Sequence, residues 1–304
     1  MVFSLAHLSD LHLPLRPGAV SLRELTGKQV LALLAWRRKR SRVPQVTDAV
    51  LDDLAAHAPD HLAVTGDLVN LGAAAEFGEA RAWLQRLGPA DRVSVVPGNH
   101  DLTVAQPWAR GIGQWEGWMQ GDADTPPGVP FPFLRRRGPV ALIGLSTAIA
   151  TAVGSAAGQL GAGQISQLET LLKATRQEGL FRVVLLHHPP VAGGARRALR
   201  DRSALCAVLR RCGAELVLHG HDHVTGLVAV PGPDGPVPIC GVPAASASRH
   251  PREAPGWRLY RIACEDRGWR LASHGRHYDQ ACGSFRPSGT WTLRIAAPVG
   301  GCGA

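Results

Sequence analysis

The sequence of 304 residues has no long hydrophobic run, little lysine and few aromatic residues. No stretch reaches the roughly 18 uninterrupted apolar residues that a membrane-spanning helix requires. The first residues, MVFSLAHLSD, have no basic leader and carry His7 and Asp10 inside their apolar run. A secretory signal is therefore not indicated. We expect a cytoplasmic protein, which at most contacts the inner face of the membrane at its periphery.

Cysteine is also scarce, and no two cysteines form a C-x-x-C pair. A chain with enough apolar residues for a large core has no need of a disulfide framework, and the spacing does not fit a thiolate metal site. We therefore expect reduced thiols. The six cysteines stand at positions 206, 212, 240, 264, 282 and 302.

Positive charge is supplied almost entirely by arginine, since Lys28, Lys39 and Lys173 are the only lysines. Lysine and arginine outnumber aspartate and glutamate by 33 to 24, which gives a net charge of +9. Such a surplus favours anionic partners, but it can equally reflect genome composition, so charge alone assigns no partner. With 45% hydrophobic and 19% charged residues the chain has ample material for a core, which excludes a disordered or fibrous protein.

Short apolar runs rich in valine and leucine alternate with helix-like segments through the first 223 residues. This alternation is typical of a layered α/β domain. The expected strands are 3–8, 61–66, 92–98, 140–146, 181–187 and 215–220, and the expected helices are about 45–58, 74–87, 164–177 and 198–212.

After His223 the pattern changes to short strand candidates separated by Pro-Gly and Gly-rich turns, with no long helix. We expect these strands to form a second, largely antiparallel sheet that completes one sandwich. Residues 1–295 would then be a single domain, and residues 296–304 a flexible tail.

Two segments interrupt the alternation and are candidate insertions. Residues 13–44 combine an amphipathic helix pattern with the basic run at 37–42, and residues 104–138 contain Trp108, Trp115 and Trp118 among many glycines and prolines. The basic run is a solvated helix end, or it makes residues 22–42 a peripheral membrane contact. Nucleic-acid binding is the least favoured alternative, because no interleaved aromatic platform accompanies the charge. The tryptophan segment favours cap packing over ligand stacking.

Polar side chains follow five of the expected strands, at the carboxyl ends where an open α/β sheet presents its ligands. Carboxylates, imidazoles and one amide form an oxygen and nitrogen ligand field that suits manganese, iron or zinc. Seven such ligands exceed the needs of one ion and serve two ions if one carboxylate is shared, an arrangement suited to phosphoester hydrolysis. The candidate metal ligands are Asp10, His12, Asp67, Asn99, His187, His221 and His223.

These residues lie in five blocks: D-x-H at 10–12, GD at 66–67 followed by Asn70, GNHD at 98–101, H-x-P at 187–189 and GHDH at 220–223. In this order the blocks resemble the signature of the calcineurin-like metallophosphoesterases, over residues 5 to about 245. The HHPP form is most similar to the bacterial class III cyclic-nucleotide and glycerophosphodiester phosphodiesterases. The resemblance implies a four-layer α/β/β/α sandwich of two mixed β-sheets flanked by helices.

The resemblance also implies a role for each residue of the blocks. Asp67 would bridge the two metal ions, and His188 would be structural. His100 would stabilise developing charge or protonate the leaving oxygen, while Asp101 would orient His100 by a hydrogen bond. One ion would be bound by Asp10, His12, Asp67 and His223, and the other by Asp67, Asn99, His187 and His221.

We therefore expect an enzyme in which a metal-bridging hydroxide hydrolyses a phosphodiester, with two divalent ions (Mn, Fe or Zn) as cofactors. The substrate would be a small phosphate ester or a lipid-linked one. One alternative is a pyrophosphatase acting on a nucleotide-linked lipid such as UDP-2,3-diacylglucosamine, with 104–138 as a lid and 13–44 facing the membrane. A non-catalytic scaffold with the same fold is a further alternative, which the intact ligand set disfavours.

Overall fold

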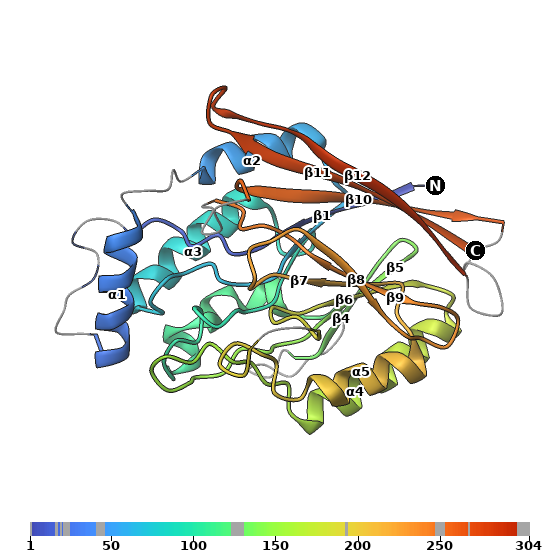
Figure 1. The fold of residues 1–304 in the computed structure, drawn as a ribbon, viewed down its shortest axis with the longest axis horizontal. Coiled ribbons are helices and arrows are strands. Elements are labelled where there is room, and N and C mark those ends of the chain that lie inside the picture. The colour runs from blue at the N-terminus through green and yellow to red at the C-terminus, as the bar shows by residue number, and fades with distance from the viewer. Residues whose placement is uncertain are drawn as a thin grey trace.

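Two six-stranded sheets form the centre of the computed structural model (Figure 1), which describes residues 2–15, 18, 20, 25–40, 46–122, 131–191, 194–246, 253–266 and 268–296. The first sheet has the order β12 (Ser284–Ala296), β11 (Gly268–Asp279), β10 (Gly256–Glu265), β1 (Val2–Leu8), β2 (His61–Val64), β3 (Val93–Val95). The second has the order β4 (Phe133–Arg137), β5 (Val140–Gly144), β6 (Phe181–Leu185), β7 (Leu216–His219), β9 (Val237–Gly241), β8 (Gly226–Val230).

Both sheets are mixed. In the first sheet β1, β2 and β3 are parallel, and β10, β11 and β12 continue the sheet with antiparallel pairing. In the second sheet β5, β6, β7 and β9 are parallel, while the edge strands β4 and β8 are antiparallel to their neighbours. Parallel strands with helical crossovers bring several strand carboxyl ends to one edge of each sheet, which is where the candidate ligands stand.

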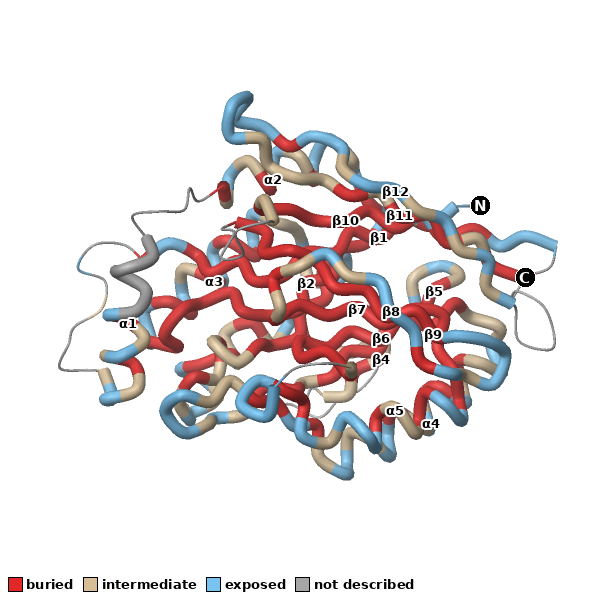
Figure 2. The backbone as a smooth tube through the Cα atoms, viewed as in Figure 1, coloured by how far each residue is buried: buried red, intermediate tan, exposed pale blue. Residues whose placement is uncertain are grey.

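Helices cover the outer faces of the two sheets. α2 (Thr47–His57) and α3 (Ala74–Leu87) pack on the first sheet, and α4 (Ala162–Gln177) and α5 (Arg202–Cys212) on the second. Along β1, Phe3 and Leu5 enter the core between the sheets, whereas Ala6 and Leu8 face the helical layer. Because alternate residues of a strand point to opposite faces, a nearly unbroken apolar strand can be buried on both sides, as Figure 2 shows for the central strands. The predicted four-layer sandwich is confirmed.

The strands after His223 do not form a sheet of their own, so that prediction is wrong. β10, β11 and β12 extend the first sheet through antiparallel pairing of β10 with β1, and β8 and β9 extend the second. Short strands of similar composition carry no local signal of which sheet edge they will join, since that choice depends on which edge the rest of the chain leaves open.

The tryptophan segment packs into the body of the domain in its described part. The 3₁₀ helices η2 (Trp108–Arg110) and η3 (Ile112–Met119) precede β4. The indole of Trp115 donates to the carbonyl of Phe77, and that of Trp118 donates to the carbonyl of Gly88. Both side chains are buried in the core between the first sheet and its helices. Residues 123–130 of the segment lie outside the described residues.

α1 (Gly27–Arg40) stands at the left edge of the molecule in Figure 1. The buried Gln29 donates to the carbonyls of Leu71 and Gly72, and Lys28 donates to the carbonyl of Thr151. The basic run at 37–42 falls outside the residues whose side chains are described, as do residues 21–24. None of the described helices is long and apolar enough to cross a membrane.

Four cysteines are free thiols: Cys206, Cys212, Cys240 and Cys282. Cys264 is disulfide-bonded, so the expectation of reduced thiols is wrong at this position.

Candidate metal centre

All seven predicted ligands lie in loops that follow the carboxyl ends of β1, β2, β3, β6 and β7, and these loops meet at one end of the sandwich. Three of the loops come from the first sheet and two from the second. The site is therefore built across both sheets, and it exists only when they are packed together.

The backbone of these loops is unusual. Of the six non-glycine residues with positive φ in the described chain, five are predicted ligands: Asp10, His12, Asp67, His221 and His223. A left-handed backbone is unfavourable for such residues, and it occurs mostly where the surrounding structure requires a special side-chain direction. The positive φ values therefore mark the same residues as the sequence blocks.

Two glycines allow the loops to approach one another closely. A Cβ at Gly98 would collide with the carboxylate of Asp67, and a Cβ at Gly220 would collide with the side chains of Ser9 and Asp10. Only glycine leaves room for these carboxylates.

A first group of side chains surrounds Asp10. Nε2 of His223 lies 3.0 Å from Oδ1 of Asp10, and Nε2 of His12 lies 4.0 Å from the same oxygen. Nε2 of His12 is also 3.9 Å from Oδ2 of Asp67. All four side chains are buried or nearly so.

A second group shares Asp67 with the first. Nε2 of His187 lies 3.5 Å from Oδ2 of Asp67 and 3.2 Å from Oδ1 of Asn99. The same Asn99 oxygen is 2.9 Å from Nδ1 of His221. The carboxylate of Asp67 thus stands between two clusters of oxygen and nitrogen donors.

The two adjacent histidines after β6 differ in their bonding. Nδ1 of His187 contacts the carbonyl of Thr65 at 2.6 Å, which fixes the ring with Nε2 toward the ligand cluster. Nδ1 of His188 contacts Oγ1 of Thr147 at 2.8 Å, and its Nε2 contacts the carbonyl of Ala156 at 3.0 Å. Both ring nitrogens of His188 are engaged in protein hydrogen bonds, as a structural residue requires.

Asp101 has a different role from the predicted one. Its carboxylate accepts the backbone N–H groups of Asp67 (2.9 Å), Leu68 (2.9 Å), Val69 (3.1 Å) and Gly98 (2.8 Å). We expected Asp101 to orient His100, but the hydrogen bonds give that place to a backbone carbonyl. Through these hydrogen bonds Asp101 instead links the loop after β2 to the loop after β3.

The carbonyl that fixes His100 belongs to Asn70, at 2.6 Å from Nδ1. The backbone N–H of His100 donates to Oδ1 of Asp67 at 2.7 Å, and its ring meets that of His12 edge to face at 4.8 Å. Its ring nitrogens also lie close enough to those of His12 and the carboxylate of Asp67 to complete a three-residue donor cluster. His100 therefore lies directly beside two predicted ligands, His12 and Asp67.

The charges of the site hold its carboxylates ionised. Burial raises the pKa of Asp67, but His187, His100 and His12 together bring it well below its ordinary value. Burial also raises the pKa of Asp10. His223 and His187 outweigh this effect, so the pKa of Asp10 lies below its ordinary value. Burial lowers the pKa of His221 to about 2, with a further contribution from His187, so this imidazole is neutral and available to bind a metal.

The residues fit a metal centre by a further test. A buried ring nitrogen of His221 (Nε2) and one of His223 (Nδ1) have no hydrogen-bond partner among the described side chains. A buried donor or acceptor left unpaired is costly, and a bound cation would satisfy it. The clusters Asp10, His12, His223 and Asp10, Asp67, His187 each bring three donor atoms within 4.8 Å of one another.

A pocket of about 510 Å³ opens over these clusters. Its walls include Asp222, which belongs to the GHDH block, and also Arg197 and residues 154–156, which lie outside all five blocks. Arg197 is not part of a family motif. Apart from its being an arginine, nothing in the sequence indicated that it would lie at this pocket.

Comparison with known proteins agrees with this geometry. The family model described as calcineurin-like phosphoesterase matches residues 3–225, which is well over half of the chain. The chain belongs to the calcineurin-like phosphoesterase family. Candidate ligand clusters of the kind found here accord with the two-metal centre that is typical of calcineurin-like phosphoesterases.

Individual relatives are distant. A probable cyclic nucleotide phosphodiesterase from Synechococcus sp. (strain WH7803) is 36% identical over 105 residues, which is 32% of this chain and 38% of that protein. A dimetal phosphatase from Danio rerio has a TM-score of 0.61 at 13% identity, with 97% of this chain and 99% of that chain covered. A purple acid phosphatase from yellow lupin seeds has a TM-score of 0.61 at 12% identity, with 97% and 54% covered. These two structures share the fold of the family.

Proposed function

We propose that this phosphoesterase hydrolyses a phosphodiester and uses a dinuclear metal centre. The observation that carries the proposal is the convergence of seven oxygen and nitrogen donors from five strand ends, with the Asp67 carboxylate between two clusters. Part of the chain is similar to a protein named as a probable cyclic nucleotide phosphodiesterase, which supports a diester as substrate.

In this proposal Asp10, His12, Asp67 and His223 hold one divalent ion. Asp67, Asn99, His187 and His221 hold the other. Two ions held by these residues would lower the pKa of a bound water and stabilise negative charge on the phosphoryl oxygens. Manganese, iron and zinc all suit this donor set.

His100 lines the pocket and would contact the phosphoryl and leaving-group oxygens of a bound substrate. Its Nδ1 contacts the Asn70 carbonyl and therefore carries a proton there, so the ring acts through Nε2. Protonated at both nitrogens, it would stabilise negative charge on the phosphoryl group, and its Nε2 proton would pass to the leaving oxygen. Asp101 would act only through the backbone of the two loops that it joins.

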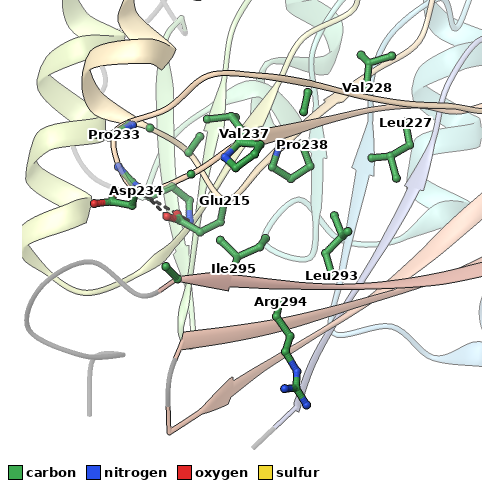
Figure 3. Close-up of a pocket in the computed structure, with 17 residues that line it drawn as sticks. Glu215, Leu227, Val228, Pro233, Asp234, Val237, Pro238, Leu293, Arg294 and Ile295 are labelled. Carbon is green, nitrogen blue, oxygen red and sulfur yellow. Dashed lines mark hydrogen bonds and ion pairs between the residues drawn. The ribbon is translucent and has the colours of Figure 1, made fainter.

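A lipid-linked substrate would need an apolar groove next to the metal centre. The described chain does contain a largely apolar pocket of about 500 Å³, lined by Leu227, Val228, Leu293 and Ile295 (Figure 3). This pocket also includes Arg182, near the start of β6, whereas His187 follows the end of the same strand. It therefore lies at the opposite end of the sheet, and the walls over the metal centre favour a small polar substrate over an acylated one.

Contact of residues 22–42 with an anionic membrane remains a prediction. Leu31 and Leu34 of α1 are 53% and 49% exposed, so the described part of this helix presents apolar side chains to its surroundings. Sedimentation with anionic vesicles, compared between the wild type and a variant with Arg37, Arg38, Arg40 and Arg42 changed to Gln, tests this contact. Equal partitioning of the two proteins would contradict it.

Turnover of a substrate panel tests the proposed function. The metal-depleted protein is reconstituted with manganese, iron or zinc and assayed with cyclic AMP, a glycerophosphodiester, bis-p-nitrophenyl phosphate and UDP-2,3-diacylglucosamine. We expect metal-dependent hydrolysis of at least one diester and a stoichiometry of two ions. Activity that survives without metal would refute the proposal, and turnover of the lipid alone would replace it by the pyrophosphatase alternative.

A further inference from the structure

Arg197 is the only lysine or arginine among the described residues that line the pocket over the metal centre. It lies between β6 and α5, and its side chain is 57% exposed. A cation at the rim of a pocket that receives phosphate esters is a natural contact for the substrate, but only if the protein holds it in place.

Two hydrogen bonds of Arg197 and one of the preceding residue hold this arginine in position. Its backbone N–H donates to the carbonyl of Gly194 at 2.8 Å, and the carbonyl of the preceding Arg196 accepts the N–H of Ala156 at 2.8 Å. Nη2 of Arg197 donates to the carbonyl of His221 at 3.0 Å. The guanidinium is thus tied to a loop that carries a predicted metal ligand, and it needs little further ordering when it binds an anion.

The guanidinium retains donors for a ligand. Arginine has five N–H groups in a fixed planar fork, and the His221 carbonyl uses one of them. The carboxylate of Asp222 is 3.9 Å from Nη2, which is too long for a hydrogen bond. Asp222 therefore lowers the net charge at the edge of the pocket but does not occupy the N–H donors of the guanidinium. Such a fork matches the oxygens of a phosphoryl group.

We propose that Arg197 is a specificity-determining residue that binds a non-esterified phosphoryl oxygen of the substrate and favours substrates with a second negative charge. The inference rests on the proposed phosphoesterase function. That second charge has two sources with the same chemistry: the third oxygen of a phosphomonoester, or the neighbouring phosphoryl group of a pyrophosphate. A simple diester has neither, so the proposed hydrolysis of such a diester does not depend on Arg197.

Arg197→Gln tests the proposal, because the amide can still donate to the His221 carbonyl while the charge and the fork are lost. Arg196→Gln is the matched control, since Arg196 is an exposed neighbour in the same loop that is not among the residues lining the pocket. The substrates are bis-p-nitrophenyl phosphate with one negative charge, p-nitrophenyl phosphate with two on one phosphorus, and UDP-glucose with one on each phosphoryl group.

We expect Arg197→Gln to lower kcat/KM by about 10- to 100-fold for a doubly charged substrate, the range of a lost charge-assisted hydrogen bond. Bis-p-nitrophenyl phosphate should lose less than about threefold, and Arg196→Gln should match the wild type. Loss with p-nitrophenyl phosphate assigns the monoester oxygen, and loss with UDP-glucose assigns the second phosphoryl group. An equal loss on all three substrates, or none on any, would overturn the proposal.

A binding measurement separates this inference from the proposed function. Titration of the metal-loaded protein with inorganic phosphate should give a Kd about tenfold higher for Arg197→Gln than for Arg196→Gln, at unchanged metal content. If no phosphoester is hydrolysed but this difference appears, the proposed function fails and the Arg197 site stands. If turnover is normal and the two variants bind phosphate equally, only the Arg197 inference fails.

Discussion

The role of His100 gives the sharpest test of the proposed chemistry, because the structure places this residue next to two predicted ligands. If His100 acts on the substrate, His100→Ala should lower turnover and leave both metal ions in place. If it completes the cluster with His12 and Asp67, the same substitution should remove an ion.

The size of the effect follows from how firmly the ring is held. Nδ1 of His100 contacts the Asn70 carbonyl at 2.6 Å, and the N–H of Asn70 donates to the buried Glu76 at 2.8 Å. Gln29 of α1 bonds the carbonyls of the two following residues. A ring fixed by such a restrained loop should make the full contribution of general acid catalysis, about 10²–10⁴-fold in kcat, or about 3–5 kcal/mol.

The assay is kcat for bis-p-nitrophenyl phosphate together with elemental analysis of the same preparation. His57→Ala is a suitable control, since His57 lies at the end of α2, away from the ligand loops, and is 29% exposed. We expect full metal content in all three proteins and loss of turnover only in His100→Ala. A stoichiometry that falls from two ions to one in this variant would refute the reasoning and make His100 a ligand.

Three further predictions concern the ligands, the turns and the buried histidines. Asp67→Asn should reduce metal content below two ions and abolish most activity, because both clusters lose the same charge; unchanged metal analysis would contradict the bridging role. Gly220→Ala should also lose metal, since the new Cβ collides with Asp10, whereas Gly226→Ala, with open space around it, should not. Burial lowers the pKa of His61 from 6.5 to about 3, so the folded state resists protonation, and its stability is intact above pH 6.5 and falls as the pH drops toward 3. Between pH 6.5 and pH 5, urea unfolding should therefore show that the wild type loses about 2 kcal/mol more stability than His61→Gln, and identical pH slopes would contradict it.

The sequence predicted the ligand loops well because each of them combines a local signal with a predictable location. A run such as 61–64 is apolar enough to be recognised as a buried strand, and the polar residue that follows it must lie at the carboxyl end of that strand. Parallel pairing of β2 and β3 brings Asp67 and Asn99 to one edge of the first sheet, and packing of the second sheet against the first adds His187. The helix expected at about 74–87 agrees with α3, Ala74–Leu87.

Features that depend on distant contacts were not predictable in this way. β4 lies inside the segment 104–138 that we expected to be an insertion, yet its Arg135 is buried and donates to the carbonyls of Gln120, Val93 and Gly117. Arg197 reaches the pocket only because its loop is bonded to residue 156, which is 41 positions away. The pairing of Asp101 with backbone rather than with His100 likewise depends on the fold of two loops.

The positive φ values of the predicted ligands show how the fold itself holds these residues in place. Each left-handed residue costs of order 1–3 kcal/mol, a cost that the surrounding contacts must offset. Backbone hydrogen bonds of 2.9 Å from Asp10 to Gly66 and from His12 to Asp67 tie the β1 loop to the β2 loop, and Asp101 ties the β2 loop to the β3 loop. The second sheet then contributes the β7 loop, where the N–H of His221 donates to Asp10 at 3.0 Å. Because these bonds link the two sheets at the predicted ligands, packing of the sandwich also brings together the residues of the candidate metal centre.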